Sequence, residues 1–372
     1  MNAHDQPPAA SAVETETIDD RAAASVLSPG GDANRYEPST GATARLRSLD
    51  AVRGLAIVVM LLAMHPGPQD DPVQLEHPAW HGLRFVDLFF PLFLFSVGVS
   101  MAFSSRASNG RQMLRRAALL ALLGIAVGSL KHEHFALTGV LQHVAGASVV
   151  AFAVLRAPRR WQAPIAAAIV AMVWAGFLIW AAGRDPWGRS DTLAHAVDGA
   201  LLGGFTSEGV IQTLISSVTV IGGALAGRLI REVPDRGRLV RLIATRGLAL
   251  IGGGMLLAVL VPLNKRLWSP SFAVLTVGTS YAWLAIGMWL IDVRGHRRWA
   301  GPLVHLGTNP IVVYVLFMAV LALLNNFAGA AFPTLTPAGS ETLGALVYAT
   351  AWTVLWWSFA YLLFRHRIFI KV

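Results

Sequence analysis

Apolar stretches of bilayer-spanning length alternate with short polar connections from residue 48 onward. An α-helix needs about 20 consecutive apolar residues to cross the hydrocarbon core of a membrane. The pattern therefore predicts an all-α polytopic membrane protein with about ten transmembrane helices. We place these helices at residues 48–64, 84–104, 114–130, 137–155, 163–182, 209–230, 245–262, 271–292, 302–324 and 342–364.

The composition agrees with a membrane protein and excludes several kinds of site. Of the 372 residues, 55% are hydrophobic and only 14% are charged, and the mean hydropathy is +0.55, outside the usual range of a soluble domain. The sequence contains no cysteine. Disulfide frameworks, zinc sites built from thiolates and cysteine nucleophiles are therefore excluded.

The first 44 residues have a different character from the rest of the chain. They contain no apolar run and are rich in Ala, Ser, Thr, Asp, Glu and Pro. This composition predicts a disordered, acidic tail at 1–44, followed by a transmembrane domain at 45–372. Because the tail has no apolar core of a signal peptide, we expect the first hydrophobic segment to anchor the chain in an inner membrane.

The formal net charge of +9 is explained by the distribution of basic residues among the connections. Arg and Lys gather in alternate connections, at 106–116, 156–160, 228–246, 294–298 and 365–371. Cytoplasmic connections of membrane proteins carry an excess of Arg and Lys. The bias predicts a multi-pass protein with both termini in the cytoplasm. The excess of positive charge is explained by the orientation of the protein in the lipid bilayer, and binding of nucleic acid is not needed to explain it.

The stretch LEHPAWHGLRFVDLFFPLFLF, at 75–95, places titratable groups where an apolar segment begins, on the predicted outer side. Solvated loop residues are the ordinary explanation for polar groups at such a place. His77 and Asp87 differ, because an ionised carboxylate at the start of a membrane helix is either paired or costly. A carboxylate that holds one imidazole nitrogen leaves the other free to act as a base.

Other polar residues fall inside or beside the apolar segments. Asp50 and Arg53 are three residues apart and share a helix face, either as a structural pair or as a site for an anionic ligand. Gln142 opens the fourth segment, Asn309 and a proline interrupt the ninth, and Glu208 precedes the sixth. Such residues bind freed backbone groups where a protein lines a cavity, although a simple kink is more common.

Several blocks resemble, in order and spacing, the heparan-alpha-glucosaminide N-acetyltransferase family and its bacterial relatives. The blocks cover about residues 45–372 and read RLRSLDAVRGLAIVVMLLAMHPG, HPAWHGLRFVDLFFPLFLFSVGVSM, GVLQH, EGVIQTLISSVTVIGGALAG, NKRLWSPSF, GTNP and FRHRIFIKV. The resemblance implies acetyl transfer across the membrane, from cytoplasmic acetyl-CoA to the amine of a glucosamine on the far side. It places the active histidine at His77 and its partner aspartate at Asp87.

The remaining site residues follow from this resemblance. CoA, which carries several phosphates, is expected near Arg53 and Asp50, with Gln142 and Asn309 as further contacts on the donor side. The acceptor, an amino sugar or a glucosamine-containing glycan, is expected near Trp80, His81 and Glu208. No metal is expected. A homodimer is suggested by analogy with relatives.

The sequence leaves several alternatives open. The family's asparagine before proline-glycine is replaced here by Met64, followed by His65, and its arginine after GVLQ is replaced by His143. His77 acts either as the base for direct transfer or as a carrier that is itself acetylated. A secondary transporter of amino sugars is the rival function, because such carriers also have broken helices and embedded polar residues. A zinc site at 132–134 is a weaker hypothesis, since no further ligands are evident.

Overall fold

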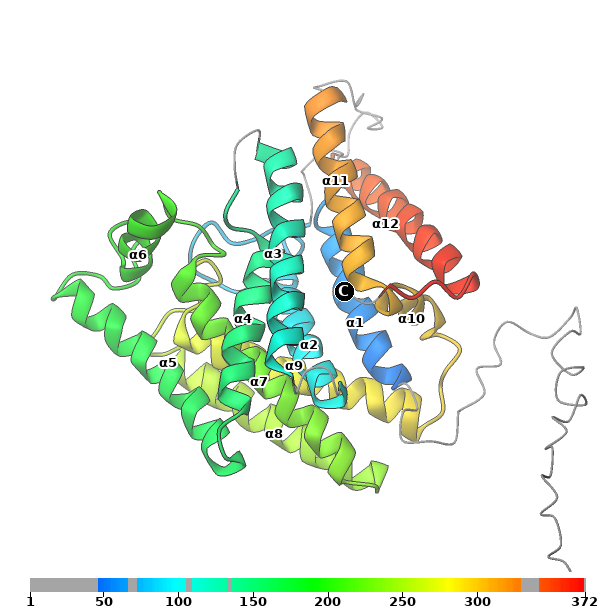
Figure 1. The fold of residues 1–372 in the computed structure, drawn as a ribbon, viewed down its shortest axis with the longest axis horizontal. Helices are drawn as coiled ribbons and strands as arrows, with labels where there is room; N and C mark the ends of the chain where they lie inside the picture. The colour runs from blue at the N-terminus through cyan, green and yellow to red at the C-terminus, as the bar shows by residue number, and fades with distance from the viewer. Residues whose placement is uncertain (1–45, 66–71, 105–108, 133–135, 329–340, 371–372) are drawn as a thin grey trace, which may run out of the picture. The chain divides into compact units, whose positions relative to one another are not determined.

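The computed structural model describes residues 46–65, 72–104, 109–132, 136–328 and 341–370. The predicted tail at 1–44 lies outside these residues. Every regular element in the described part is helical, as Figure 1 shows, so the all-α prediction is confirmed. The helices are α1 (Arg47–Leu62), η2 (Phe85–Leu88), α2 (Phe89–Phe103), α3 (Gly110–His132), α4 (Val140–Leu155), α5 (Arg159–Ala181), α6 (Leu193–Leu202), α7 (Val210–Glu232), α8 (Arg236–Leu257), α9 (Pro270–Met288), η4 (Trp289–Val293), α10 (Gly301–Thr308), α11 (Pro310–Ala328) and α12 (Glu341–Arg365).

Each predicted apolar segment falls on a helix, but the count of ten membrane spans is not confirmed. Among the described residues, seven helices are long and apolar enough to cross a membrane, and a bent pair brings the number to eight. The helices α1 and α4 contain only 16 residues each. At 1.5 Å per residue they are about 24 Å long, shorter than a hydrocarbon core of about 30 Å.

The ninth predicted segment is interrupted, as the asparagine-proline pair indicated. Gly301–Thr308 and Pro310–Leu324 are bent by 78° at Asn309. Proline lacks a backbone N–H and favours the first position of a helix, which explains why α11 begins at Pro310. The chain therefore enters this segment as the short helix α10 and continues in a new direction as α11.

The short helix α6 was not predicted, and it has a clear structural role. Asp198 lies in α6 and is buried. Its carboxylate oxygens accept hydrogen bonds from the N–H groups of Val210 (3.0 Å) and Thr206 (3.4 Å). The first N–H groups of a helix have no partner within it, so Asp198 caps the start of α7 from a neighbouring helix.

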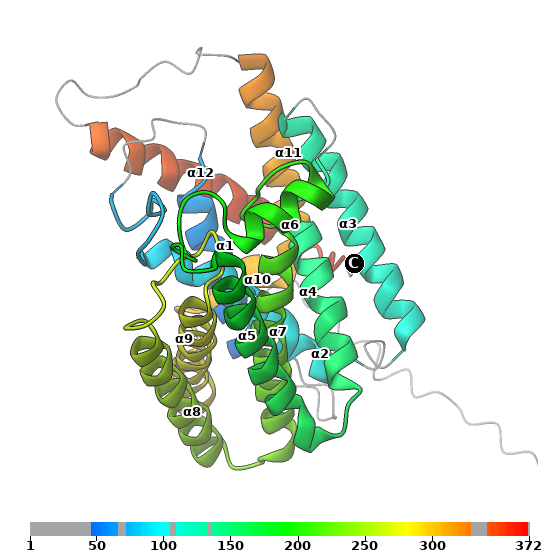
Figure 2. The same ribbon diagram turned by 90° about the vertical axis from the view of Figure 1, so that its left-hand side faces the viewer.

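The helices divide into an inner and an outer group. In the apolar windows of α2 and α7, 78% and 67% of the residues are buried, against 22% for α8 and 17% for α12. Figures 1 and 2 show α2 and α7 among the other helices, whereas α8 and α12 lie at the periphery. Large apolar side chains such as Leu256 and Val259 are 74% and 79% exposed on the peripheral surface. Such a surface is the one that a bilayer covers, so the chain is a multi-pass membrane protein.

Glycines bring the inner helices into close contact. A Cβ atom at Gly98 in α2 would overlap the carbonyl group of Val220 in α7, and one at Gly223 would overlap that of Phe95. Lipid tails are as apolar as leucine, so membrane helices associate mainly through close packing of small residues. These two glycines therefore set the distance between α2 and α7.

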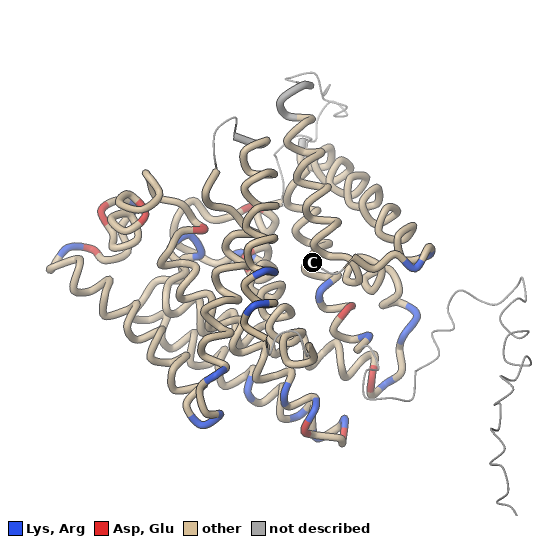
Figure 3. Tube along the Cα trace, viewed as in Figure 1, with Lys and Arg blue, Asp and Glu red and all other residues tan. Residues whose placement is uncertain are grey.

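The connections are grouped at the two ends of the bundle. At one end, which we call the loop end, the N–H of Gly82 donates to the Leu263 carbonyl (2.8 Å) and the indole of Trp80 donates to the Trp187 carbonyl (2.8 Å). At the other, which we call the basic end, α5 begins, α7 ends and α8 begins. Figure 3 shows Lys and Arg gathered there. This separation agrees with the alternation of basic residues in the sequence.

Candidate active site

His77 and Asp87 meet at the loop end. Nδ1 of His77 lies 2.7 Å from Oδ1 of Asp87. The side chain of Asp87 has no exposed surface, whereas that of His77 is 48% exposed. Because a carboxylate only accepts hydrogen bonds, Nδ1 carries the hydrogen and Nε2 is left with a lone pair. The structure thus brings together the two residues that the sequence predicted as catalytic.

The segment between the two residues folds back on itself and fixes their geometry. Asp87 lies in η2, where its Oδ2 accepts the N–H of Arg84 (2.9 Å). Arg84 also forms an ion pair with Glu76 (2.9 Å), next to His77. The N–H of Phe85 donates to the side chain of Gln74 (3.0 Å). These contacts hold the imidazole at the start of α2, and none of them involves its Nε2 atom.

Lys265 is a third member of this group, and the sequence analysis missed it. Its Nζ lies 2.9 Å from Nε2 and 3.2 Å from Nδ1 of His77, and 3.6 Å from Oδ1 of Asp87. Burial lowers the pKa of Lys265 below its usual value, and the charges of Asp87 and Glu208 partly oppose that effect. An ammonium group therefore lies directly against the imidazole and the carboxylate.

The turn that carries Lys265 is held by Asn264. This fully buried residue donates its N–H to the Ser269 hydroxyl (3.0 Å) and accepts the N–H of Leu267 on its side-chain oxygen (2.9 Å). Its amide nitrogen lies 3.3 Å from Nδ1 of His81. The block NKRLWSPSF, quoted for the family resemblance, contains both Asn264 and Lys265, and this was the signal that could have identified them.

The three predicted acceptor residues lie around the same end. Trp80 is only 8% exposed, and its ring centroid is 6.3 Å from that of His81 and 6.0 Å from that of Phe205. Glu208 accepts hydrogen bonds from the hydroxyls of Ser207 (3.0 Å) and Thr206 (3.4 Å). Its charge acts on Lys265, which places Glu208 near the His77–Asp87 pair.

Arg53 and Asp50 form a separate group that joins three helices. The guanidinium of Arg53 in α1 donates to the Gly307 carbonyl of α10 (3.1 Å) and approaches Asp50 (3.4 Å). It also donates to the hydroxyls of Ser96 (3.4 Å) and Ser100 in α2. These bonds all lie within the bundle, and they favour a structural pair over a site for an anionic ligand.

The other two predicted donor contacts have different surroundings. Asn309 is buried, and its side chain bonds the backbone of the C-terminal segment, at the Ile368 carbonyl (2.8 Å) and the Ile370 N–H (2.9 Å). It lies two residues from Gly307, beside the Arg53 group. Gln142 lies elsewhere, where α4 meets α3, and its amide donates to the Ala136 carbonyl (3.3 Å). The structure therefore groups Asn309 with Arg53 and leaves Gln142 apart.

Met64, which stands where the family has asparagine, is half-buried, whereas the neighbouring His65 and the His143 that replaces the family's arginine are both buried. His65 is 4% exposed. His143 is fully buried between α4 and α7, and its Nε2 lies 2.6 Å from the Ser216 hydroxyl. Within the described part of the chain, no group of three or more His, Asp or Glu side chains has the arrangement of a metal site. The hypothetical zinc ligands Glu133 and His134 lie outside the described residues.

Comparison with known proteins agrees with the resemblance drawn from the motifs. Residues 45–182 match the family model described as heparan-alpha-glucosaminide N-acetyltransferase, catalytic. The human protein named heparan-alpha-glucosaminide N-acetyltransferase is 26% identical over 88% of this chain and 60% of its own length. The mouse protein of the same name is 24% identical over 91% of this chain and 62% of its own length. The chain thus spans somewhat less than two thirds of these relatives, and the predicted resemblance to the family is confirmed.

Replacement of Arg53 tests the structural interpretation of the first group. Arg53→Ala removes the bonds between α1, α2 and α10 and takes away one cation beside Asp50. We expect the free energy of unfolding to fall by about 3 kcal/mol, a typical cost for breaking a buried pair. The measurement is the thermal midpoint in detergent, with Arg238→Ala on the exposed first turn of α8 as the matched control. An unchanged midpoint together with lost acetyl-CoA binding would instead identify Arg53 as a donor ligand.

Proposed function

We propose that this relative of the heparan-alpha-glucosaminide N-acetyltransferase family is a transmembrane acyltransferase. It moves an acetyl group from acetyl-CoA, taken up at the basic end, to the amine of an amino sugar or glucosamine-containing glycan at the loop end. The observation that supports this most directly is the buried Asp87 carboxylate against the half-exposed His77 imidazole, with the ammonium of Lys265 touching both.

The chemistry follows from the protonation states of the reactants. The acceptor amine is protonated in much of the neutral range and must lose a proton before it attacks the thioester carbon. Nε2 of His77 accepts that proton, and Asp87 stabilises the imidazolium that forms. A C–N bond forms, the C–S bond breaks, His77 passes its proton to the CoA thiolate, and the second proton that the nitrogen loses goes to water. The variant route, in which His77 is acetylated first, uses the same atoms in two steps.

Lys265 has a defined role in this mechanism. Attack on the thioester places a negative charge on the carbonyl oxygen, and a fixed donor near that oxygen stabilises the transition state. The Lys265 Nζ already lies 2.9 Å from the nitrogen that accepts the proton. When the acceptor amine takes the place beside Nε2, the ammonium turns to the oxygen of the thioester. The proposal thus gives Lys265 the role of a charged oxyanion donor.

The donor approaches from the basic end. Phosphate groups bind Arg strongly, and arginines gather in the connections at this end. Arg53 reaches α2 at Ser96, nine residues after Asp87. At 1.5 Å per residue, the two levels are about 13 Å apart along the helix. The acetyl group therefore has to cross part of the membrane thickness to meet His77.

A secondary transporter of amino sugars is the second candidate function. The observation that favours it is the 78° break at Asn309, because carriers place such breaks at their substrate sites. The Asn309 side chain, however, bonds the backbone at Ile368 and Ile370, so the chain itself satisfies the break. The His77–Asp87 pair also lies at the loop end, whereas carriers bind their substrates near the midplane.

The proposed location is an inner membrane, with both termini in the cytoplasm and the loop end outside. A homodimer is proposed by analogy with relatives only. The chain has no cysteine, so a single introduced cysteine reports its own position. Val73 lies in the loop that carries His77, and it is 60% exposed. It suits the introduction of a cysteine better than Gln74, because the Gln74 side chain accepts a hydrogen bond from Phe85.

Labelling at two positions tests this orientation. We expect Val73→Cys to react with a membrane-impermeant maleimide added to intact spheroplasts, because the charge bias places this loop outside. Arg297→Cys, exposed in a basic connection, is the control and is expected to react only after lysis. The reverse pattern would place the loop end in the cytoplasm.

Variants of the pair test the chemistry. We expect His77→Ala to lower acetyl transfer by about a hundredfold to ten-thousandfold, the range for a general base, while acetyl-CoA binding persists. Asp87→Asn should be nearly as damaging, because the amide favours the wrong tautomer and cannot stabilise an imidazolium. His81→Ala should be milder. The assay follows release of CoA with a thiol reagent in the presence of glucosamine, and the protein itself contributes no thiol.

Two results would contradict the mechanism. The first is transfer at the wild-type rate by a monodisperse His77→Ala protein. The second is loss of amino-sugar uptake in these variants when the parent protein releases no CoA, which would favour the transporter.

Variants of Lys265 test its role as a charged donor. We expect Lys265→Met to lower the rate constant about a hundredfold, as removal of an oxyanion donor does. Burial lowers the pKa of Lys265, so the wild type loses this charge at a pH below the ordinary lysine value of 10.5, and activity should fall as pH rises. Lys265→Arg stays charged and should keep its activity to higher pH. If both variants share the wild-type pH profile, Lys265 serves only in packing.

A further inference from the structure

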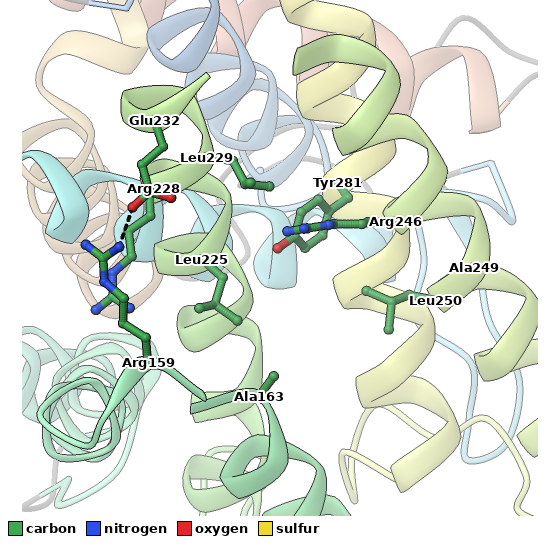
Figure 4. Close-up of a pocket in the computed structure, with 10 residues that line it drawn as sticks. All are labelled: Arg159, Ala163, Leu225, Arg228, Leu229, Glu232, Arg246, Ala249, Leu250 and Tyr281. Carbon is green, nitrogen blue, oxygen red and sulfur yellow. Dashed lines mark hydrogen bonds and ion pairs between the residues drawn. The ribbon is translucent and has the colours of Figure 1, made fainter. Parts of the chain in front are cut away.

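A groove at the basic end has no part in the chemistry described above. It has a volume of about 550 Å³ and lies between α5, α7, α8 and α9, as Figure 4 shows. Its lining is mainly apolar, with Leu225 and Leu229 on one side and Leu250 on the other. The hydroxyl of Tyr281 donates to the Gly222 carbonyl (2.8 Å), so this side chain offers mainly its ring to the groove. The floor of the groove therefore suits a hydrocarbon chain.

The rim of the groove carries an excess of positive charge. Arg159, Arg228 and Arg246 line it together with a single acidic residue, Glu232. Arg159 pairs with Glu232 at 2.7 Å, and Arg228 donates to the side chain of Gln162, which is neutral. Among the described residues, no hydrogen bond or ion pair is made by Arg246. Arg159 and Arg228 thus share the single carboxylate of Glu232, and the rim keeps a net positive charge.

The three arginines lie near the ends of the predicted apolar segments. The apolar segments predicted from the sequence begin at 163 and 245 and end at 230, within a few residues of Arg159, Arg246 and Arg228 respectively. The first turns of α8 extend beyond this level. Arg246 is on an exposed position of α8, ten residues after its start, or about 15 Å along the helix. A cation at such a position is costly unless it meets an anion or the interface.

The helix surfaces beside the groove expose large apolar side chains, as surfaces that face lipid do. The neighbouring surface of α8 presents Leu248, which is 65% exposed, and the neighbouring surface of α5 presents Met172, which is 56% exposed. An occupant that combines an apolar chain with a phosphate could enter sideways from the bilayer without crossing water. Basic pockets between helices on the cytoplasmic side of membrane proteins bind anionic headgroups in this way.

We propose that this groove binds one anionic phospholipid. The phosphate lies between Arg246 and Arg228, and an acyl chain covers Leu225, Leu229 and the ring of Tyr281. The apolar floor and the apolar helix surfaces beside it favour this occupant over a soluble phosphate such as the CoA nucleotide, which has no hydrocarbon tail to cover the floor. The proposal does not depend on the acetyltransferase function, because none of its residues belongs to the His77 group.

The test compares lipids retained by the purified full-length protein. The protein is reconstituted in nanodiscs of phosphatidylcholine with and without phosphatidylglycerol, and retained lipid is measured by native mass spectrometry after detergent extraction. We expect preferential retention of one phosphatidylglycerol by the wild type. Arg246→Gln should weaken it about fivefold, the effect of one charge near a membrane surface. Arg246→Lys, which keeps the charge, should restore most of it.

Arg241→Gln provides the matched control, since Arg241 is exposed on the same helix but does not line the groove. We expect it to retain phosphatidylglycerol as the wild type does. An equal loss in Arg241→Gln would mean general surface attraction and would overturn the proposal. It would also be overturned if the wild type did not prefer phosphatidylglycerol, or if CoA displaced the lipid and Arg246→Gln weakened CoA binding, which would make the groove part of the donor site.

Discussion

The arrangement of the loop end depends on one buried carboxylate. Asp87 has no exposed surface, and a charge removed from water at the mouth of a membrane helix must be compensated by its neighbours. Three groups do so from different parts of the chain, the imidazole of His77, the N–H of Arg84 and the ammonium of Lys265. Two of these, the imidazole and the ammonium, are the groups that the proposed mechanism uses. The interactions that stabilise the buried carboxylate of Asp87 therefore also place a base beside a cation.

The helices beneath this group are positioned by close packing of small residues. Gly98 and Gly223 allow α2 and α7 to touch through their backbones, and Gly54 in α1 approaches the Leu303 carbonyl of α10 in the same way. At that second contact Arg53 adds directional bonds to Gly307 and Ser96. Packing fixes how far apart the helices lie, and the arginine fixes their register. Together they hold α2, and hence Asp87, at a defined height in the bundle.

The sequence predicted the helical class, the position of the apolar segments and the His77–Asp87 pair, because hydropathy and a motif are local properties. It did not predict the number of spans, because α1 and α4 are apolar enough to be recognised yet are only 16 residues long. Lys265 was missed because its contact with His77 joins residues 188 positions apart, and the block NKRLWSPSF that contains it does not show this contact. The sequence marks Arg53 and Asn309 as candidate donor contacts, and only the three-dimensional structure shows their bonds to the Gly307 carbonyl and the Ile368 carbonyl.

Lys265 bears on how the replacement of the family's asparagine by Met64 is interpreted. The resemblance leads to the expectation of an amide near the thioester carbonyl, with His65, which is 4% exposed, as a candidate replacement. Lys265 contacts His77, and a charged donor forms a hydrogen bond about twice as strong as a neutral amide does. A charged donor works only while it is protonated, and burial lowers the pKa of Lys265. An enzyme that replaced an amide by this lysine would gain electrostatic stabilisation of the oxyanion, and its activity would become sensitive to alkaline pH in a way that an amide-based site is not.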